Sequence, residues 1–428
     1  MEKLLKVSQQ TSWQLFGKII TSLTTLFILS LISRNFGEAQ TGTITLALTY
    51  LAFFSLVADF GINAHILPSF IEGDITLKWR KMLGFRTVFT ICSALAALIG
   101  IILWPNINEE FQKAVLIGLF GVFEGGIWIC ALAVFQSKLR YDLAVTATVL
   151  GTLTTLIMVV LLVNYQVSPS LIMLAYVAGW IVTGTVAFWG VSKLITTNPK
   201  TTFIKQLLPI IDWNYIRRII KESWPISLTL ILNIAYFRLD TFILSFLKTF
   251  NEVGIYNVSF QVFQAALVVP AFIMNSYYPL MLKSFKDDNC RFFKELAYAG
   301  ILMVVLGFTG TITTLFLAPM IINIITGGQG FTGSVQALQI LSLGFPAYFL
   351  SAILMWTMIT LKKYKTMLVV YLIGLLFNVF LNFLLIPQYS FIAASFVTVV
   401  SEYLILIIQL FILLPLFFKR QSLEVAKI

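Results

Sequence analysis

The chain has 428 residues, of which 59% are hydrophobic and 11% are charged, and its mean hydropathy is +0.93. Soluble globular domains carry about 25% charged residues, so this composition excludes the soluble classes and predicts a polytopic membrane protein. A net charge of +11 would suggest nucleic-acid binding in a soluble protein. Here it reflects basic loops beside an anionic membrane surface, and we expect no nucleic-acid partner.

Apolar segments long enough to cross a bilayer, roughly 20 residues each, recur along the whole chain. We predict an all-α polytopic membrane protein with about 12 transmembrane helices. The first segment is too long for the core of a cleaved signal peptide, so we interpret it as a first membrane helix. The predicted spans are 13–34, 42–66, 84–104, 113–135, 142–163, 170–192, 222–247, 254–282, 295–317, 337–361, 366–386 and 391–417.

The basic residues fix a topology. Of the 29 Lys and Arg, all but four fall on one side of the membrane when the spans are threaded in order. The exceptions are Arg34, Lys113 and Lys248 on the other side, and Arg238 inside a span. Because basic loops stay in the cytoplasm, we expect both termini to be cytoplasmic. We expect the protein in a bacterial inner membrane as a multi-pass protein in contact with membrane lipids.

The longest internal link divides the chain into two lobes of six spans. We predict an N-terminal lobe at 1–195, a cytoplasmic linker at 196–221 and a C-terminal lobe at 222–428. Basic and apolar residues alternate in the linker. Its second part therefore resembles an amphipathic segment lying on the inner leaflet, and a solvated linker is the alternative.

The two lobes echo each other in sequence. Phe36-Gly37-Glu38 follows the first span, and Phe250-Asn251-Glu252 follows the seventh. An even number of spans separates these copies, so both have the same orientation. This describes parallel repeats related by an axis along the membrane normal.

Short motifs in both lobes resemble a known family. The chain is similar to the Wzx-type polysaccharide or O-antigen flippases of the multidrug/oligosaccharidyl-lipid/polysaccharide exporter superfamily. The motifs that carry the resemblance are Ile32-Ser33-Arg34-Asn35-Phe36-Gly37-Glu38, Gly42, Asp59-Phe60-Gly61, Trp224-Pro225, Asp240-Thr241-Phe242-Ile243-Leu244, Val253-Gly254-Ile255-Tyr256 and Tyr278-Pro279.

The resemblance implies a flippase that moves an undecaprenyl-diphosphate-linked oligosaccharide from the inner to the outer leaflet by alternating access. The cargo would be an O-antigen, lipopolysaccharide, capsule or exopolysaccharide repeat unit. It also implies coupling to an ion gradient (H+ or Na+) and a polysaccharide polymerase as a partner. The sequence has no GxxxxGK[ST] phosphate loop, so we expect no ATP use by this chain and no cofactor.

Charged side chains in the middle of a span cost about 2.5–3.5 kcal/mol on insertion scales and usually face a cavity or a partner. Arg238 and Asp240 are two residues apart on one predicted helix, so they point in different directions. An arginine at this depth suits a diphosphate or an acidic sugar, and a structural ion pair is the alternative. The predicted substrate-binding residues are Arg238, Asp240, Lys18, Arg34, Asn257 and Gln261. Snorkelling of Lys18 to the headgroups explains that residue equally well.

Three carboxylates are candidates for ion coupling. Glu124 lies at mid-depth in a span between glycines, and Glu402 lies in the last span. Asp59 matches the aspartate of the family motif. Each could carry a proton or cation across the membrane, and each could instead make a structural hydrogen bond. We interpret the single histidine, His65, as an interfacial polar residue.

Two other classes compete with a flippase. A multidrug or metabolite cation antiporter of the same fold shares the topology and the parallel halves. A membrane polymerase or glycosyltransferase would need a large external loop or a supported carboxylate motif, whereas the external links here are short. Asp287-Asp288 lies among basic residues and is interpreted as a solvated loop. We therefore do not expect an enzyme.

Overall fold

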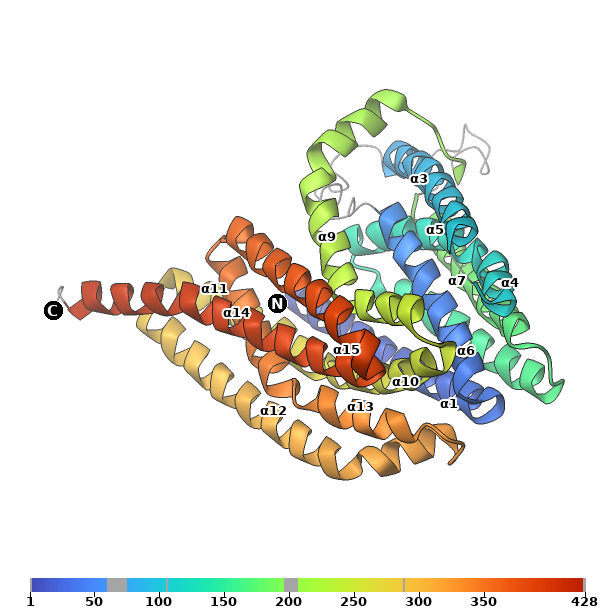
Figure 1. Cartoon of the computed structure of the whole chain (residues 1–428). Coiled ribbons are helices and arrows are strands. Elements are labelled where there is room, and N and C mark those ends of the chain that lie inside the picture. The colour runs from blue at the N-terminus through green and yellow to red at the C-terminus, as the bar shows by residue number, and fades with distance from the viewer. Residues whose placement is uncertain (1, 60–74, 105–106, 196–206, 288, 426–428) are drawn as a thin grey trace. The chain divides into compact units, whose positions relative to one another are not determined.

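The computed structural model describes residues 2–59, 75–104, 107–195, 207–287 and 289–425, and Figure 1 shows its helices. All regular structure in these residues is helical. Eight of the described helices are long and apolar enough to cross a membrane, and nine if the bent pair α13–α14 counts as one span. The prediction of an all-α polytopic membrane protein is confirmed. His65, Asp288 and the start of the predicted linker lie outside the described residues.

The chain divides into two compact units, Met1–Ile234 and Ala235–Ile428. In the first unit α6 packs along α7 and α1, and α3 packs on α5. Its helices are α1 (Glu2–Asp59), α3 (Ile75–Leu103), α4 (Glu109–Gly118), α5 (Phe120–Ser137), α6 (Tyr141–Asn164), the short 3-10 helix η2 (Pro169–Ile172), α7 (Met173–Ile195) and the first part of α9 (Trp213–Leu247).

The second unit contains the end of α9 and six further helices. In it α14 packs between α12 and α15, and α10 packs on α13. The helices are α10 (Phe250–Ala266), α11 (Val268–Asp287), α12 (Asn289–Thr326), α13 (Thr332–Ser342), α14 (Phe345–Thr360) and α15 (Tyr364–Val425). The division at 234/235 falls inside α9, and the predicted lobe boundaries stay a prediction.

Two long helices each hold two of the predicted spans. α1 is broken at Gly37, where φ is 73° and ψ is −176°, a backbone conformation that favours glycine. α15 is broken at Ser390, where φ is 53° and ψ is −134°. These breaks fall between spans 13–34 and 42–66, and between spans 366–386 and 391–417. The count of about 12 spans and the cytoplasmic termini stay predictions.

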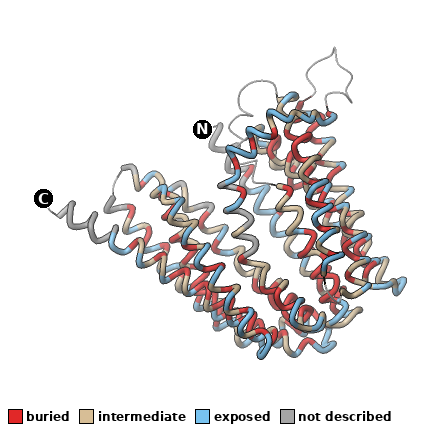
Figure 2. Tube along the Cα trace, turned by 45° about the horizontal axis from the view of Figure 1, so that its top comes forward, coloured by how far each residue is buried: buried red, intermediate tan, exposed pale blue. Residues whose placement is uncertain are grey.

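The helices of each unit carry both buried and exposed positions. Figure 2 shows buried, intermediate and exposed positions alternating along the helices of each unit. Large apolar side chains occupy many exposed positions; Phe316, Ile102 and Phe411 are 80%, 77% and 74% exposed. A soluble protein would not tolerate so much exposed apolar surface, but a bilayer solvates it.

Glycines bring α6 and α7 into direct backbone contact. A Cβ on Gly151 would lie 1.8 Å from the Thr183 hydroxyl and 2.8 Å from the Gly179 carbonyl oxygen. A Cβ on Gly179 would lie 1.9 Å from the Thr155 hydroxyl and 2.6 Å from the Gly151 carbonyl oxygen. This reciprocal arrangement is the small-residue contact by which membrane helices pack closely.

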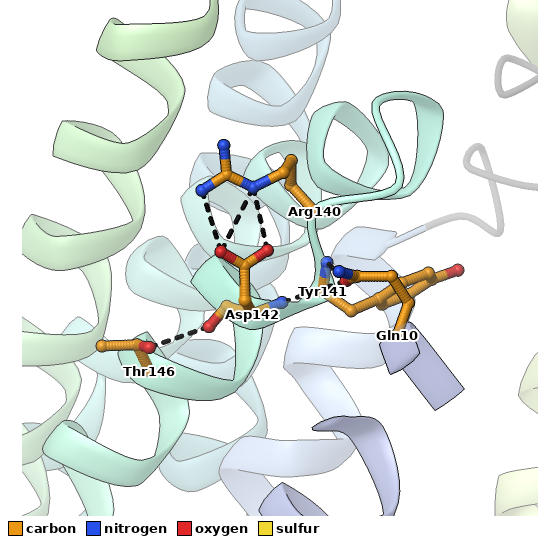
Figure 3. Close-up of polar contacts among 5 residues, drawn as sticks. All are labelled: Gln10, Arg140, Tyr141, Asp142 and Thr146. Atoms are coloured by element: carbon orange, nitrogen blue, oxygen red, sulfur yellow. Dashed lines mark hydrogen bonds and ion pairs between the residues drawn. The ribbon is translucent and has the colours of Figure 1, made fainter. Parts of the chain in front are cut away.

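Polar contacts fasten the start of α6 to α1 (Figure 3). The Gln10 side-chain oxygen accepts from the backbone N–H groups of Tyr141 and Asp142 at 2.7 and 3.3 Å, which satisfies two donors at the helix N-terminus. Arg140 donates to both carboxylate oxygens of Asp142. Hydrogen bonding to this carboxylate raises the pKa of Arg140.

The described part of the linker packs on the N-terminal part of α3. The Trp79 indole donates to the Leu207 carbonyl at 3.2 Å, and Ile210 N–H donates to the Arg80 carbonyl at 2.9 Å. Lys81 pairs with Asp212 at 2.8 Å, and this lysine holds the pKa of Asp212 below its usual value. Leu207 is buried, whereas other apolar linker side chains are exposed, such as Leu208, Ile211 and Trp213. One side of the segment is therefore bound to protein, and the interfacial position of its other side stays a prediction.

Candidate functional site

Arg238 lies near the C-terminal end of α9 and is directed toward α10. Its Nη2 donates to the Gln264 side-chain oxygen at 3.1 Å, and its guanidinium carbon lies 5.5 Å from the centre of the Phe260 ring. An arginine has five N–H donors, and within the described residues only one is used in a hydrogen bond. The side chain is half-buried. The guanidinium is therefore held by Gln264 and Phe260, and its remaining N–H donors make no hydrogen bond among the described residues.

Asp240, two residues further along α9, has a different set of partners. Its Oδ2 accepts from the hydroxyls of Tyr256 at 2.7 Å and Thr398 at 2.6 Å. The side chain is 1% exposed. Its other oxygen, Oδ1, is buried without a hydrogen-bond partner among the described residues. Arg238 and Asp240 are thus held by separate contacts, Arg238 through α10 and Asp240 through α10 and α15.

The two predicted amides of α10 lie along the same part of α9. Asn257 is buried, and its side-chain oxygen accepts from the Thr241 hydroxyl at 3.1 Å. Gln261 is half-buried, one helical turn further along. Together with the Arg238–Gln264 contact, these residues form a polar strip between α9 and α10. We call Arg238, Asn257, Gln261 and Gln264 the arginine strip.

Glu402 of α15 is buried and contacts Tyr236 of α9, two residues before Arg238. Its Oε2 accepts from the Tyr236 hydroxyl at 3.1 Å, and its Oε1 accepts a short hydrogen bond from the Ser351 hydroxyl of α14. Its side chain is 3% exposed. Sequence reasoning identified Glu402 and quoted Tyr256 only as part of a family motif. It missed Tyr236 and Ser351, which together with Tyr256 hold the buried carboxylates.

Glu124 is the buried carboxylate of the first unit. It lies on α5, and a Cβ on Gly184 of α7 would sit 3.3 Å from its Cγ, so the two helices approach closely there. Glu124 is 7% exposed, and its Oε1 has no hydrogen-bond partner among the described residues. A carboxylate without a donor in an apolar interior is costly when charged, which keeps Glu124 a candidate for proton binding.

Asp59, at the end of α1, pairs with a residue that sequence reasoning did not single out. Arg86 Nη2 lies 2.5 Å from Asp59 Oδ1, and the side chains are 1% and 17% exposed. Arg86 also donates to the Ala58 carbonyl at 3.5 Å. The signal in the sequence was an arginine two positions inside the predicted span 84–104, which we had grouped with the cytoplasmic cations.

Lys18 and Arg34 belong to α1 in the first unit, and both are exposed. The carbonyl of Lys18 accepts from the Thr21 hydroxyl, a bond that leaves the ammonium group uninvolved. Of the predicted substrate-binding residues, the structure therefore groups Arg238, Asp240, Asn257 and Gln261 around one helix. Lys18 and Arg34 stay separate predictions. No cluster of three or more potential metal-ligating residues occurs among the described residues.

The polysaccharide biosynthesis protein family matches residues 7–285, which is more than half of the chain. The chain belongs to this family. Among curated proteins, no sequence matches it. The match includes all of the first unit's described helices and the arginine strip of the second.

Solved structures show the same fold at low sequence identity. The chain superposes on the lipid II flippase MurJ in an inward closed conformation with a TM-score of 0.75 at 15% identity, covering 95% of this chain and 87% of that one. An inward-facing multidrug resistance MATE family transporter of the MOP superfamily gives a TM-score of 0.68 at 12% identity, covering 95% of both chains. A Vibrio cholerae MATE transporter gives 0.58 at 15%, covering 96% and 98%.

The family match and the fold confirm the resemblance to the exporter superfamily that the sequence motifs indicated. The solved neighbours are a flippase and transporters. The chain is therefore a multi-pass membrane protein with the fold of this superfamily.

Proposed function

We propose that this protein is a flippase that translocates an undecaprenyl-diphosphate-linked oligosaccharide repeat unit from the inner to the outer leaflet of a bacterial inner membrane. The repeat unit would belong to an O-antigen, a lipopolysaccharide, a capsule or an exopolysaccharide. Membership of the polysaccharide biosynthesis family and the MurJ-like fold support the cargo class. A polysaccharide polymerase would take up the product on the outer side.

The observation that carries the proposal is the arrangement of Arg238. The guanidinium of Arg238 is held by Gln264 and by the Phe260 ring and uses only one of its donors among the described residues, so it suits an anionic oxygen group. Guanidinium forks match diphosphate and carboxylate geometry. The amides of Asn257 and Gln261 lie along the same strip and can accept from or donate to sugar hydroxyls. Lys18 and Arg34 would meet the diphosphate elsewhere on its path.

Translocation by alternating access needs an energy source, and we propose an ion gradient of H+ or Na+. Glu124, Glu402 and Asp59 are the proposed coupling residues. The two buried acids, Glu124 and Glu402, meet this role best because neither pairs with a cation among the described residues. Asp59 has such a partner in Arg86, so any coupling through Asp59 must open that ion pair.

A multidrug or metabolite cation antiporter is the second candidate. The fold likeness to MATE transporters supports it, and Glu124 supplies a buried carboxylate oxygen that lacks a donor. Such an oxygen suits an organic cation. The two candidate functions differ in the charge of the cargo. A flippase that uses the arginine strip would carry an anionic cargo, whereas an antiporter that uses the buried carboxylates would carry a cationic one.

The test locates the lipid-linked oligosaccharide in the membrane. In cells deleted for the gene, spheroplasts are treated with an external enzyme that labels outer-leaflet glycolipid. We expect inner-leaflet accumulation that the wild-type chain reverses and Arg238→Ala does not, with Arg238→Lys restoring only part of the flux. Lys113→Ala, which removes a cation paired on the surface with Glu109, is the matched control. Normal outer-leaflet labelling in the deletion strain, together with altered drug sensitivity, would establish the antiporter instead.

A further inference from the structure

The first turns of α9 are packed on the first unit by one face only. The helix begins at Trp213, and successive residues are turned by about 100° around its axis. Ile216 and Ile219 lie on one side of these turns and are 3% and 2% exposed. They belong to the same hydrophobic cluster as Trp79 and Phe85 of α3. The other faces of these turns therefore point away from the core of the unit.

A second face of the same turns is apolar and exposed. Trp213, Ile220 and Trp224 are spaced by seven and four residues, so they share one side of the helix. They are 61%, 37% and 55% exposed. Leu208 and Ile211, just before the helix, are exposed as well. Contiguous apolar surface of this kind marks an interaction site, and tryptophan is enriched where a protein meets the headgroup level of a membrane.

Two cations lie on the tryptophan face. Arg217 follows Trp213 by four residues and precedes Trp224 by seven, which places it between the two rings. Lys221 follows Arg217 by four residues. Both side chains are exposed, and neither makes a hydrogen bond or an ion pair with a described residue. The face therefore combines large amphipathic rings with two cations whose donors are available to a ligand.

The acidic residues of this segment do not neutralise these cations. Asp212 is paired with Lys81 of α3 at 2.8 Å. Glu222 is nine residues after Trp213, so it lies on about the opposite side of the helix. A negative group for Arg217 and Lys221 must therefore come from outside these turns.

The end of α7 shows a related arrangement with its cation already occupied. Lys193 Nζ lies 3.4 Å from the centre of the Trp189 ring, and this tryptophan is 54% exposed. Ile195, two residues further on, lies in the same hydrophobic cluster as Ile216 of α9. Two helix ends that meet in one cluster thus each expose tryptophan beside a cation, as expected where a protein surface meets lipid headgroups. Arg217 differs from Lys193 in having no such ring contact among the described residues.

The chemistry of this face selects its occupant. A guanidinium fork matches the oxygens of a phosphate group, and the tryptophan rings suit the glycerol and upper acyl region that adjoins a lipid phosphate. A second cation favours a headgroup with a net negative charge, and the cytoplasmic leaflet is the anionic one. We propose that Trp213, Arg217, Lys221 and Trp224 bind the headgroup of an anionic glycerophospholipid of the inner leaflet. We call these four residues the headgroup site.

The headgroup site lies at the start of a functionally interesting helix. α9 is one helix from Trp213 to Leu247, and Arg238 lies 21 residues after Arg217. A lipid held at Arg217 therefore fixes the beginning of the helix that carries the arginine strip's cation. Lipid binding itself does not depend on the proposed transport function.

The test measures which lipid touches the two tryptophans. The full-length protein is reconstituted in vesicles of phosphatidylcholine and phosphatidylglycerol, and either lipid is supplied with brominated acyl chains, which quench nearby tryptophan fluorescence. The signal of Trp213 and Trp224 is the difference between the wild type and a variant with both changed to phenylalanine. We expect brominated phosphatidylglycerol to quench this signal more than brominated phosphatidylcholine at equal mole fraction. Arg217→Gln should lower the relative association constant for phosphatidylglycerol about fivefold, the value of one cation near an anionic surface.

Arg218→Gln is the matched control. Arg218 is equally exposed and on the same turn, but it lies about 140° around the helix from Trp213, so its loss should leave the lipid preference unchanged. Equal losses in the two variants would replace the site by a diffuse attraction. Equal quenching by the two lipids, or quenching by neither, would overturn the proposal. Loss of the preference on adding inorganic phosphate would reassign the site to a free anion. The measurement needs no transported cargo, so its result is independent of the flippase assay.

Discussion

The Asp59–Arg86 pair gives a prediction whose size follows from burial. Asp59→Asn keeps the shape of the side chain and removes the charge that faces a guanidinium only 1% exposed. Breaking a buried ion pair by removing one partner costs about 3–5 kcal/mol. Asp59 is itself 17% exposed, and water can reach that edge of the site. We therefore expect the lower end, about 3 kcal/mol, which is more than a hundredfold change in the unfolding equilibrium.

A double-mutant cycle measures the interaction itself. Arg86→Met alone should also destabilise the protein, because it leaves the carboxylate in place. The double variant Asp59→Asn with Arg86→Met removes both charges and should cost less than the two single changes added together. Unfolding is followed by helical circular dichroism in mixed detergent with increasing denaturant. Asp142→Asn is the control, since its pair with Arg140 is 41% and 27% exposed, much more than the Asp59–Arg86 pair, and should be worth about 0–1 kcal/mol.

The reasoning fails if the free energy of unfolding of Asp59→Asn lies within about 0.5 kcal/mol of that of the wild type. It also fails if the destabilisation of the double variant equals the sum of the two single variants. Either result would mean that the 2.5 Å contact carries little energy and that Asp59 is available for ion coupling. The expected result has a bearing on transport assays. Loss of transport in Asp59→Asn would then report lost stability, and only a protein-level control would separate the two causes.

Two further predictions concern packing and pH. Gly151→Ala should destabilise the protein by about 1–3 kcal/mol, because its Cβ would lie 1.8 Å from the Thr183 hydroxyl. Gly125→Ala is the control in the same detergent unfolding assay and should be close to neutral, since its Cβ has no neighbour closer than 3.6 Å. Equal destabilisation by the two changes would contradict the close contact between α6 and α7. Lys81 lowers the pKa of the Asp212 carboxyl. The Lys81–Asp212 ion pair therefore stabilises the folded linker at pH values above the usual pKa of an aspartate. This stabilisation is lost as the pH falls through the lowered pKa of Asp212. Proteolysis of the linker should therefore accelerate at acidic pH in the wild type, whereas Asp212→Asn should show the fast rate at neutral pH too.

Hydropathy and the positive-inside rule were enough to predict the class, the helical content and the positions of most helices. They could not predict where a helix begins when its end lies beyond the apolar stretch. α3 begins at Ile75 and not near residue 84, because its first turns carry Trp79 and Lys81, whose partners lie in the linker. Insertion free energy measures transfer into lipid and carries no information about such contacts.

At the candidate site, too, the sequence predicted some features and could not predict the contacts between helices. Spacing along one helix indicated that Arg238 and Asp240 point apart, and that Asn257 and Gln261 share a face. It could not indicate which helix each face meets, because that depends on the packing of helices far apart in sequence. The tyrosine and serine hydroxyls that hold Asp240 and Glu402 come from α9, α10 and α14. The family motif Val253-Gly254-Ile255-Tyr256 includes Tyr256, but no pattern within a single span marks Tyr236 or Ser351 as different from any other polar residue in the lobe.

The turn at Ser390 has a practical consequence for mapping topology with inserted reporters. Ser390 donates to Glu252, which also accepts from Thr249, and Lys248 reaches the Pro387 carbonyl at 3.0 Å. Two turns more than a hundred residues apart are therefore tied together, and an epitope placed in either would sever the tie. The link after α6 is a better insertion point, since Tyr165 there is 79% exposed. Reporters at that link would read out sidedness with the native helix ends left intact.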